Sequence, residues 1–95
     1  MIIQKGTAKN KKWKAIFIDD LGKKIKTSQF GDDRYSDYTL HKDKERRTKY
    51  RSRHKGNLSK GTYMSPSHLS YYILWGASTN RNKNITDYKR KFKLN

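Results

Sequence analysis

One stretch of this chain constrains its fold more than any other. Residues 61–77 contain no Lys, Arg, Asp or Glu, although 34% of the 95 residues are charged. By contrast, residues 41–55 carry 8 basic and 2 acidic groups, and residues 81–95 carry 6 and 1. A disordered basic chain would have few apolar residues to cluster in this way. We therefore expect residues 61–77 to form the core of one small domain, with aromatic residues supplying much of its buried area.

The overall charge balance predicts an anionic partner. The chain has 24 Lys and Arg against 8 Asp and Glu, a formal net charge of +16, and a pI near 10.2. Nucleic acid, an anionic membrane surface and acidic protein are the partners that such a charge favours. The absence of cysteine excludes disulfides, zinc ribbons and thiol chemistry. No segment approaches the roughly 20 apolar residues of a membrane span, and the first residues lack a secretory apolar stretch. We expect an intracellular protein that is neither secreted nor membrane-bound.

The N-terminal part of the chain predicts a β-hairpin. Residues 1–12 are Lys-rich with little pattern, and we expect them to be a flexible basic arm preceding a single domain over residues 13–95. Alternation from Trp13 to Ile18 is typical of a strand. Turn residues at 19–22 precede a returning strand at 24–30. The hairpin should present one basic face.

Three short α-helices should follow the hairpin, over residues 43–55, 65–75 and 84–93, which gives an α+β fold. Asp43 suits the N-cap of the first helix. We expect only Arg47, Tyr50 and His54 of that helix to form an inward stripe.

The first expected helix also gives the strongest indication of function, because basic residues are concentrated in it. Its basic residues surround much of the helix, and that repulsion favours neutralisation by phosphate. The planar guanidinium group of arginine can donate two parallel hydrogen bonds to one phosphate. The predicted phosphate contacts are Arg46, Lys49, Arg51, Arg53 and Lys55, with Lys9, Lys11 and Lys12 of the arm and Lys89, Arg90, Lys91 and Lys93 of the tail. The alternative is a solvated helix on a basic protein.

Aromatic residues lie among these cations. Proteins that bind single strands use aromatic rings to stack on exposed bases and cations to contact the backbone. Tyr35 and Tyr63 are the stacking candidates. Core packing is the expected role of Trp13, Phe17, Tyr72, Trp75, Tyr88 and Phe92. Base-specific recognition is not expected, because no helix-turn-helix, zinc-finger or RNA-recognition signature is present.

Catalytic, cofactor and metal sites are not predicted. His41 and His54 lie 13 residues apart with no cysteine. The acidic residues 32, 33 and 37 could hold a hard cation, but we expect them to cap helices or pair with arginines, as Asp37 with Arg47. His54 is expected to lie against the helix that contains Trp75. The chain has no Gly-rich phosphate loop or nucleophile elbow.

Five segments occur in an order that resembles a known family: residues 27–31, 35–43, 46–54, 69–76 and 85–92. Together they are similar to small basic proteins of unknown function encoded by giant nucleocytoplasmic large DNA viruses. Lys44 departs from this pattern, which has Pro after the Asp. The resemblance implies a viral origin and a virion or genome-associated component, located in the host cytoplasm, the viral factory or the virion interior. It implies no established activity.

The sequence thus predicts a small basic viral protein that binds DNA or RNA through phosphate contacts, without sequence preference, and organises or packages a genome. We expect no enzyme activity, small-molecule substrate or cofactor. Other virion proteins are possible further partners. The alternative is a minor capsid or internal virion protein that binds acidic protein and exposes Tyr71, Leu74 or Trp75. A ribosome-associated protein is a third interpretation.

Overall fold

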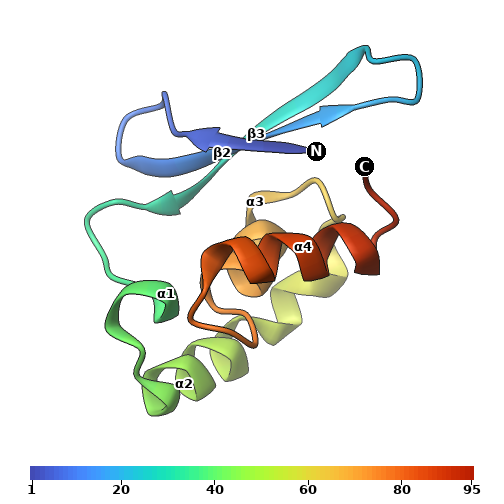
Figure 1. Cartoon of the computed structure of the whole chain (residues 1–95). Coiled ribbons are helices and arrows are strands. Elements are labelled where there is room, and N and C mark those ends of the chain that lie inside the picture. The colour runs from blue at the N-terminus through green and yellow to red at the C-terminus, as the bar shows by residue number, and fades with distance from the viewer.

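The computed structural model describes all residues, 1–95, as an antiparallel sheet with helices packed against one side (Figure 1). The sheet contains β1 (Ile2–Lys5), β2 (Lys11–Ile18) and β3 (Lys24–Asp32), in the order β1-β2-β3. The α-helices are α1 (Tyr38–His41), α2 (Lys44–His54), α3 (Pro66–Leu69) and α4 (Arg81–Lys91). A 3₁₀ helix, η1 (Lys55–Lys60), follows α2, and a π-helical segment, η2 (Ser70–Leu74), follows α3. The α+β class is confirmed, with more elements than expected.

The expected flexible arm is wrong, because residues 1–12 belong to the folded domain. β1 pairs antiparallel with β2, with Ile2 opposite Ile16 and Lys5 opposite Trp13. Met1 is buried, and its amino group donates to the carbonyl oxygen of Asn95 over 2.6 Å. A strand of four residues is too short to show the period-2 pattern that marks the longer strands.

The predicted hairpin is confirmed and is longer than expected. Trp13 lies opposite Phe30, and Ala15 opposite Ser28. Ala15 and Phe30 are fully buried on the face that the helices cover. The turn is held by the Asp19 carboxylate, which accepts from the backbone N–H groups of residues 21 and 23. Because paired residues share a face, the register fixes which face of β3 meets the helices.

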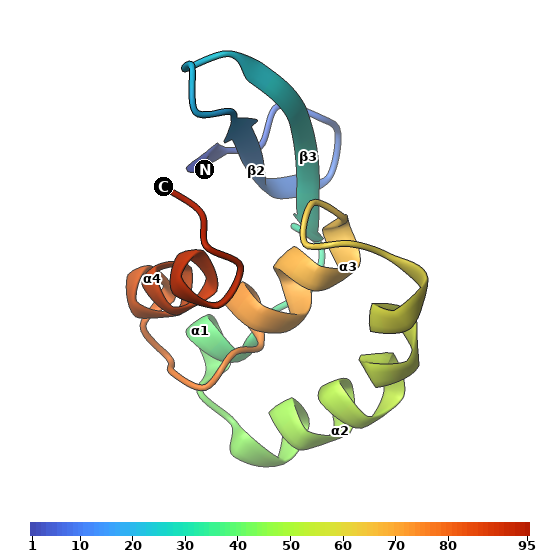
Figure 2. The same ribbon diagram turned by 90° about the vertical axis from the view of Figure 1, so that its right-hand side faces the viewer.

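The uncharged segment supplies the centre of the core, as predicted. Leu69, Ile73 and Leu74 are almost fully buried. Figure 2 shows α3 in the middle of the helical layer, with α4 on one side and α2 on the other. The six aromatics expected in the core are there: Phe17, Trp75 and Tyr88 are buried, and Trp13, Tyr72 and Phe92 pack against them.

Several helix boundaries differ from the prediction. The chain continues from α2 into η1 instead of stopping before residue 56. The second expected helix widens at its end, where the Trp75 N–H donates to the Ser70 carbonyl over 3.0 Å, five residues back. Helix α4 begins at Arg81, because the Asn80 side chain caps it by accepting from the Lys83 N–H. None of these helices combines the length and the apolar character that a membrane crossing requires.

Candidate nucleic-acid interface

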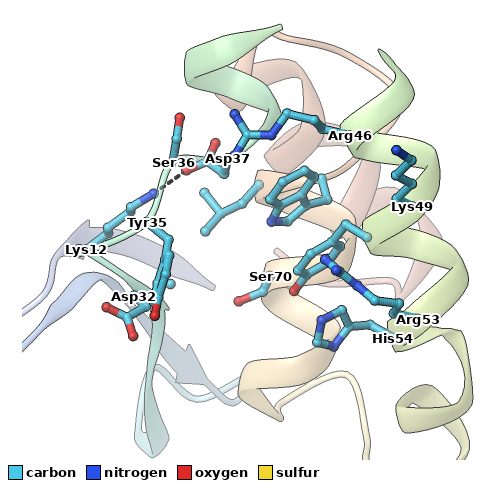
Figure 3. A pocket seen from close by; sticks show the side chains of 14 residues that line it. Lys12, Asp32, Tyr35, Ser36, Asp37, Arg46, Lys49, Arg53, His54 and Ser70 are labelled. Carbon is cyan, nitrogen blue, oxygen red and sulfur yellow. Dashed lines mark hydrogen bonds and ion pairs between the residues drawn. The ribbon is translucent and has the colours of Figure 1, made fainter. Parts of the chain in front are cut away.

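A cleft of about 640 Å³ lies between the end of β3 and helix α2 (Figure 3). The segment after β3 contributes Tyr35, Ser36 and Asp37 to one wall, and α2 forms the other. The remaining lining residues are Lys12, Gly31, Asp32, Arg46, Lys49, Tyr50, Arg53, His54, Ser70, Leu74 and Trp75. The cleft therefore joins parts of the chain that are distant in sequence.

Gly31 allows β3 to pass close to the base of the cleft. Its φ of 78° lies in the left-handed region. A Cβ at this position would lie 2.7 Å from the Cδ1 atom of Leu74. A larger residue would therefore strain the backbone and push β3 away from Leu74 of η2.

Three cations of α2 share one face at the cleft. Arg46, Lys49 and Arg53 are spaced i, i+3 and i+7, which places them on the same side of a helix. All three side chains come from the α2 side in Figure 3. We call these three residues the cationic face of α2. They are part of the predicted set, and the structure brings them together.

The cationic face carries unpaired charge. The molecule has four ion pairs, and neither Arg46 nor Arg53 takes part in any of them. Lys49 pairs with Glu45 over 3.2 Å, but both side chains are exposed. An exposed i,i+4 pair contributes only about 0.3–0.5 kcal/mol, so an incoming phosphate can displace Glu45.

An aromatic stack supports α2 beside this face. The rings of Tyr50 and Trp75 lie 4.1 Å apart and 5° from parallel, and the Tyr50 and His54 rings also lie 4.1 Å apart. His54 therefore meets the Trp75 segment through Tyr50, and its Nδ1 atom lies 3.3 Å from the Asn57 side-chain nitrogen. Burial raises the pKa of Tyr50. Of the predicted inward stripe of α2, Tyr50 packs against the core, whereas His54 stacks on Tyr50 and is only half-buried.

Arg51 is the main correction to the predicted contacts. Its guanidinium donates to the carbonyls of Tyr71 (3.1 Å) and Trp75 (2.7 Å) and lies 4.0 Å from the Tyr71 ring centre. Arg47 likewise donates to the Gly76 carbonyl over 2.6 Å. Both arginines thus satisfy carbonyls at the C-terminal end of the helix formed by α3 and η2. Burial lowers the pKa of Arg51, and this side chain is not available to phosphate.

Lys12 is the second correction. Its Nζ atom lies 2.6 Å from the Asp37 carboxylate, with both side chains largely buried. Asp37 also caps α1 by accepting from the backbone N–H of Thr39 (2.9 Å) and from its hydroxyl. The expected pairing of Asp37 with Arg47 is therefore wrong. Because Asp37 already neutralises Lys12, this lysine is not a free phosphate contact.

The two stacking candidates have different surroundings. Tyr35 lines the cleft with 69% of its surface exposed. Tyr63 packs against the rings of Phe17 (5.8 Å) and Phe92 (5.9 Å), and its carbonyl accepts from the Tyr88 hydroxyl. Tyr63 is therefore a core residue, and only Tyr35 remains placed for stacking.

The other predicted cations lie away from the cleft. Lys9 and Lys11 are exposed at the turn before β2 and at its start, and Lys55 begins η1. None of the predicted tail contacts lines the cleft. These contacts are Lys89, Arg90 and Lys91 of α4, and Lys93 after it. The Nζ atom of Lys91 lies 5.5 Å from the Tyr72 ring centre. The structure thus separates the predicted set into several regions.

The acidic and histidine residues are engaged in local structure. Asp32 pairs with Arg34 over 2.7 Å, and this hydrogen-bonded guanidinium lowers the pKa of Asp32 to about 2. His41 accepts from the Asp43 N–H through Nδ1 (3.0 Å), and burial lowers its pKa. Its Nε2 atom is buried without a partner. The chain contains no group of three or more His, Asp or Glu side chains that could hold a metal ion.

The fold and the cleft define a small basic α+β protein with a cationic, aromatic-lined cleft. Residues 1–54 match the family of unknown function DUF5754, and this match covers more than half of the chain. The protein belongs to that family. No curated protein and no solved structure matches the chain. The matched region contains both walls of the cleft, whereas Ser70, Leu74 and Trp75 lie beyond it.

Proposed function

We propose that this protein binds nucleic acid through the phosphate backbone, without sequence preference, and that the cationic face of α2 is the centre of its interface. The observation that carries the proposal is the placement of Arg46, Lys49 and Arg53 on one side of α2, with both arginines free of ion pairs. Guanidinium groups that form no ion pair within the protein can bind phosphate oxygens with paired, charge-assisted hydrogen bonds.

The physical driving force is counterion release. A net charge of +16 attracts a polyanion, and each neutralised phosphate releases condensed ions to the solvent. The exposed cations outside the cleft would add to this attraction. A role in genome organisation or packaging is a further part of the proposal, and it rests on the sequence resemblance to giant-virus proteins alone.

The interpretation as a virion protein that binds acidic protein has less support. It requires an exposed apolar or aromatic patch. Tyr71, Leu74 and Trp75 are all buried, with at most 8% of each exposed. No specific feature of the molecule favours this partner over nucleic acid.

A salt titration with matched variants tests the proposal. Arg46→Gln/Lys49→Gln/Arg53→Gln removes the cationic face. Lys23→Gln/Lys24→Gln/Lys26→Gln removes the same charge from exposed positions near the far end of the hairpin (Figure 1). Binding of a 20-nucleotide strand, its duplex and heparin would be measured by fluorescence anisotropy at several salt concentrations.

We expect the affinity of the unmodified protein to fall steeply with salt. The log–log slope should lose about 2 to 3 in the α2 variant, since each phosphate contact contributes about 0.7–0.9, and it should change much less in the hairpin variant. Equal losses of the log–log slope in the two variants would show that α2 is not the centre of the interface. A flat salt dependence would contradict nucleic-acid binding through phosphate, and equal affinity for heparin would show that charge alone governs binding.

A further inference from the structure

The cleft provides more than a charged surface. We infer that it accepts one unpaired nucleotide, whose base stacks on the exposed ring of Tyr35 while its phosphate meets Arg46 and Arg53. The protein would therefore prefer single-stranded nucleic acid to duplex. This inference rests on the proposed function and names the form of nucleic acid that the same site takes.

The size and lining of the cleft suit a flat ring. Its volume of about 640 Å³ lies within the range of about 300–1,000 Å³ found for small-ligand sites. Its apolar lining comes from Tyr35, Tyr50, Leu74 and Trp75. Tyr50 stacks on both Trp75 and His54, so the free ring face in the cleft is that of Tyr35. Aromatic side chains stack on every type of base, which gives binding without sequence preference.

Tyr35 is the residue whose surroundings would change most on binding. It is among the few large apolar side chains that remain exposed, at 69% of its surface. Figure 3 places Tyr35 on the wall opposite Arg53 and His54. A base in the cleft would cover the Tyr35 ring and remove apolar surface from water. Stacking against Tyr35 is thus available to a ligand without disturbing the core.

The charges around the cleft favour an anion on one side only. The two acidic groups of the β3 side that line the cleft are paired, Asp37 with Lys12 and Asp32 with Arg34. The opposite wall presents Arg46 and Arg53 without partners. A ligand with a neutral ring and an adjoining phosphate matches this division, and a nucleotide has that chemistry.

A duplex can use only the charged part of this site. Its bases are stacked and paired, and moving one into a cleft requires unstacking and unpairing. A single strand has bases that are already free to enter. The same protein would therefore contact both forms through α2 but fill the cleft only with single strands.

The test compares oligo(dT), oligo(U) and a DNA duplex of equal length in 0.1 M salt, by fluorescence anisotropy. Tyr35→Ala removes the exposed ring, and Tyr35→Phe retains it. Arg46→Gln/Arg53→Gln removes the cleft arginines. Lys44→Gln/Lys55→Gln removes the same charge from exposed positions of α2 and η1 that do not line the cleft.

We expect the Tyr35→Ala variant to lose about tenfold or more in affinity for oligo(dT) or oligo(U) while its duplex affinity stays unchanged. Tyr35→Phe should bind like the original protein. The cleft arginine variant should lose more single-strand affinity than its charge-matched control. The relative affinity for oligo(dT) and oligo(U) distinguishes DNA from RNA as the source of the strand.

Equal binding of duplex and single strand, or a Tyr35→Ala variant with unchanged affinity for both strands, would overturn the inference. Steep salt dependence in that case would still support the proposed function. Absence of salt-dependent binding to every probe would remove the proposed function and the inference with it.

Discussion

Asp37 shows how a single carboxylate positions one wall of the cleft. Only 2% of this residue is exposed. It accepts from Lys12 on β2 and from the first turn of α1, so it connects the sheet to the segment that carries Tyr35 and Ser36. Removing one partner of a buried ion pair leaves the other charge without compensation, and this is usually more costly than the pair itself is stabilising.

We expect Asp37→Ala to lower the free energy of unfolding by about 3 kcal/mol, measured by urea denaturation. Asp33→Ala is the matched control, because Asp33 is exposed and forms no ion pair. Its effect should stay within about 0.5 kcal/mol. A loss below about 1 kcal/mol for Asp37→Ala would show that the Lys12 ammonium remains hydrated without its partner.

His68 should make stability depend on pH. It is buried, its Nδ1 atom lies 3.0 Å from the Ser65 hydroxyl, and burial lowers its pKa below the ordinary 6.5. The unfolded chain therefore binds the proton first as the pH falls. The stability contribution is present above pH 6.5 and is lost as the pH falls toward the folded-state pKa.

Urea denaturation at pH 7.5 and pH 5 measures this effect. We expect the original protein to be less stable at pH 5 and the His68→Gln variant to show a smaller decline. His41, whose pKa is also lowered, should supply part of the remaining slope. An identical decline in the variant would exclude His68 as a source.

At the scale of elements, α2 has two different sides. Arg47 and Arg51 turn toward the end of η2 and satisfy its carbonyls, whereas Arg46 and Arg53 face the cleft. Neighbouring residues of one type therefore have opposite roles. Their roles follow from helical position, because a shift of two residues rotates a side chain by about 200°.

Arg51→Met and Arg53→Met form a matched pair of variants that separates these roles. Arg51→Met should lower the free energy of unfolding by about 2 kcal/mol, because it leaves two helix-end carbonyls without a charged donor. Arg53→Met should leave stability nearly unchanged and weaken nucleic-acid binding. Denaturation and anisotropy on both variants check this, and a larger stability loss for Arg53→Met would reverse the assignment.

The elements that could be predicted from the sequence are those with strong local signals. The alternation from Trp13, the N-cap at Asp43 and the Ser65-Pro66 start each mark an element that the structure contains. β1 could not be predicted, because its four residues become a strand only by pairing with β2. The same holds for the cleft. The density of basic residues predicted Arg46, Lys49 and Arg53 together with Arg51 and Lys55. The inward role of Arg51 depends on the position of η2, which no local pattern specifies.

At the scale of the whole molecule, charge opposes folding. The net charge of +16 remains after every Asp and Glu has been counted, and only four ion pairs form in the fold. Like charges repel across a molecule whose Cα radius of gyration is 12.9 Å. The radius of gyration is comparable to the Debye length of about 10 Å at 0.1 M salt. Ions in solution therefore screen much of the repulsion between charges on different parts of the molecule.

We expect the melting temperature to rise by a few degrees between 20 and 300 mM sodium chloride, because screening lowers the self-repulsion of the folded state. Differential scanning fluorimetry measures this change. The Lys23→Gln/Lys24→Gln/Lys26→Gln variant, with three fewer positive charges, should show a smaller rise. A melting temperature that falls with salt would mean that attractive pairs outweigh the net charge.

Helix α2 contains no fully buried residue, so stacked rings and two arginines hold it in place. Elements with so little buried surface open more readily than the core. A nucleic-acid strand that binds in the cleft would have to immobilise this helix. Part of the free energy of binding would be used in doing so. Tighter association could therefore evolve without any new contact to the strand, through substitutions on the inner side of α2 that stiffen it in advance and slow dissociation.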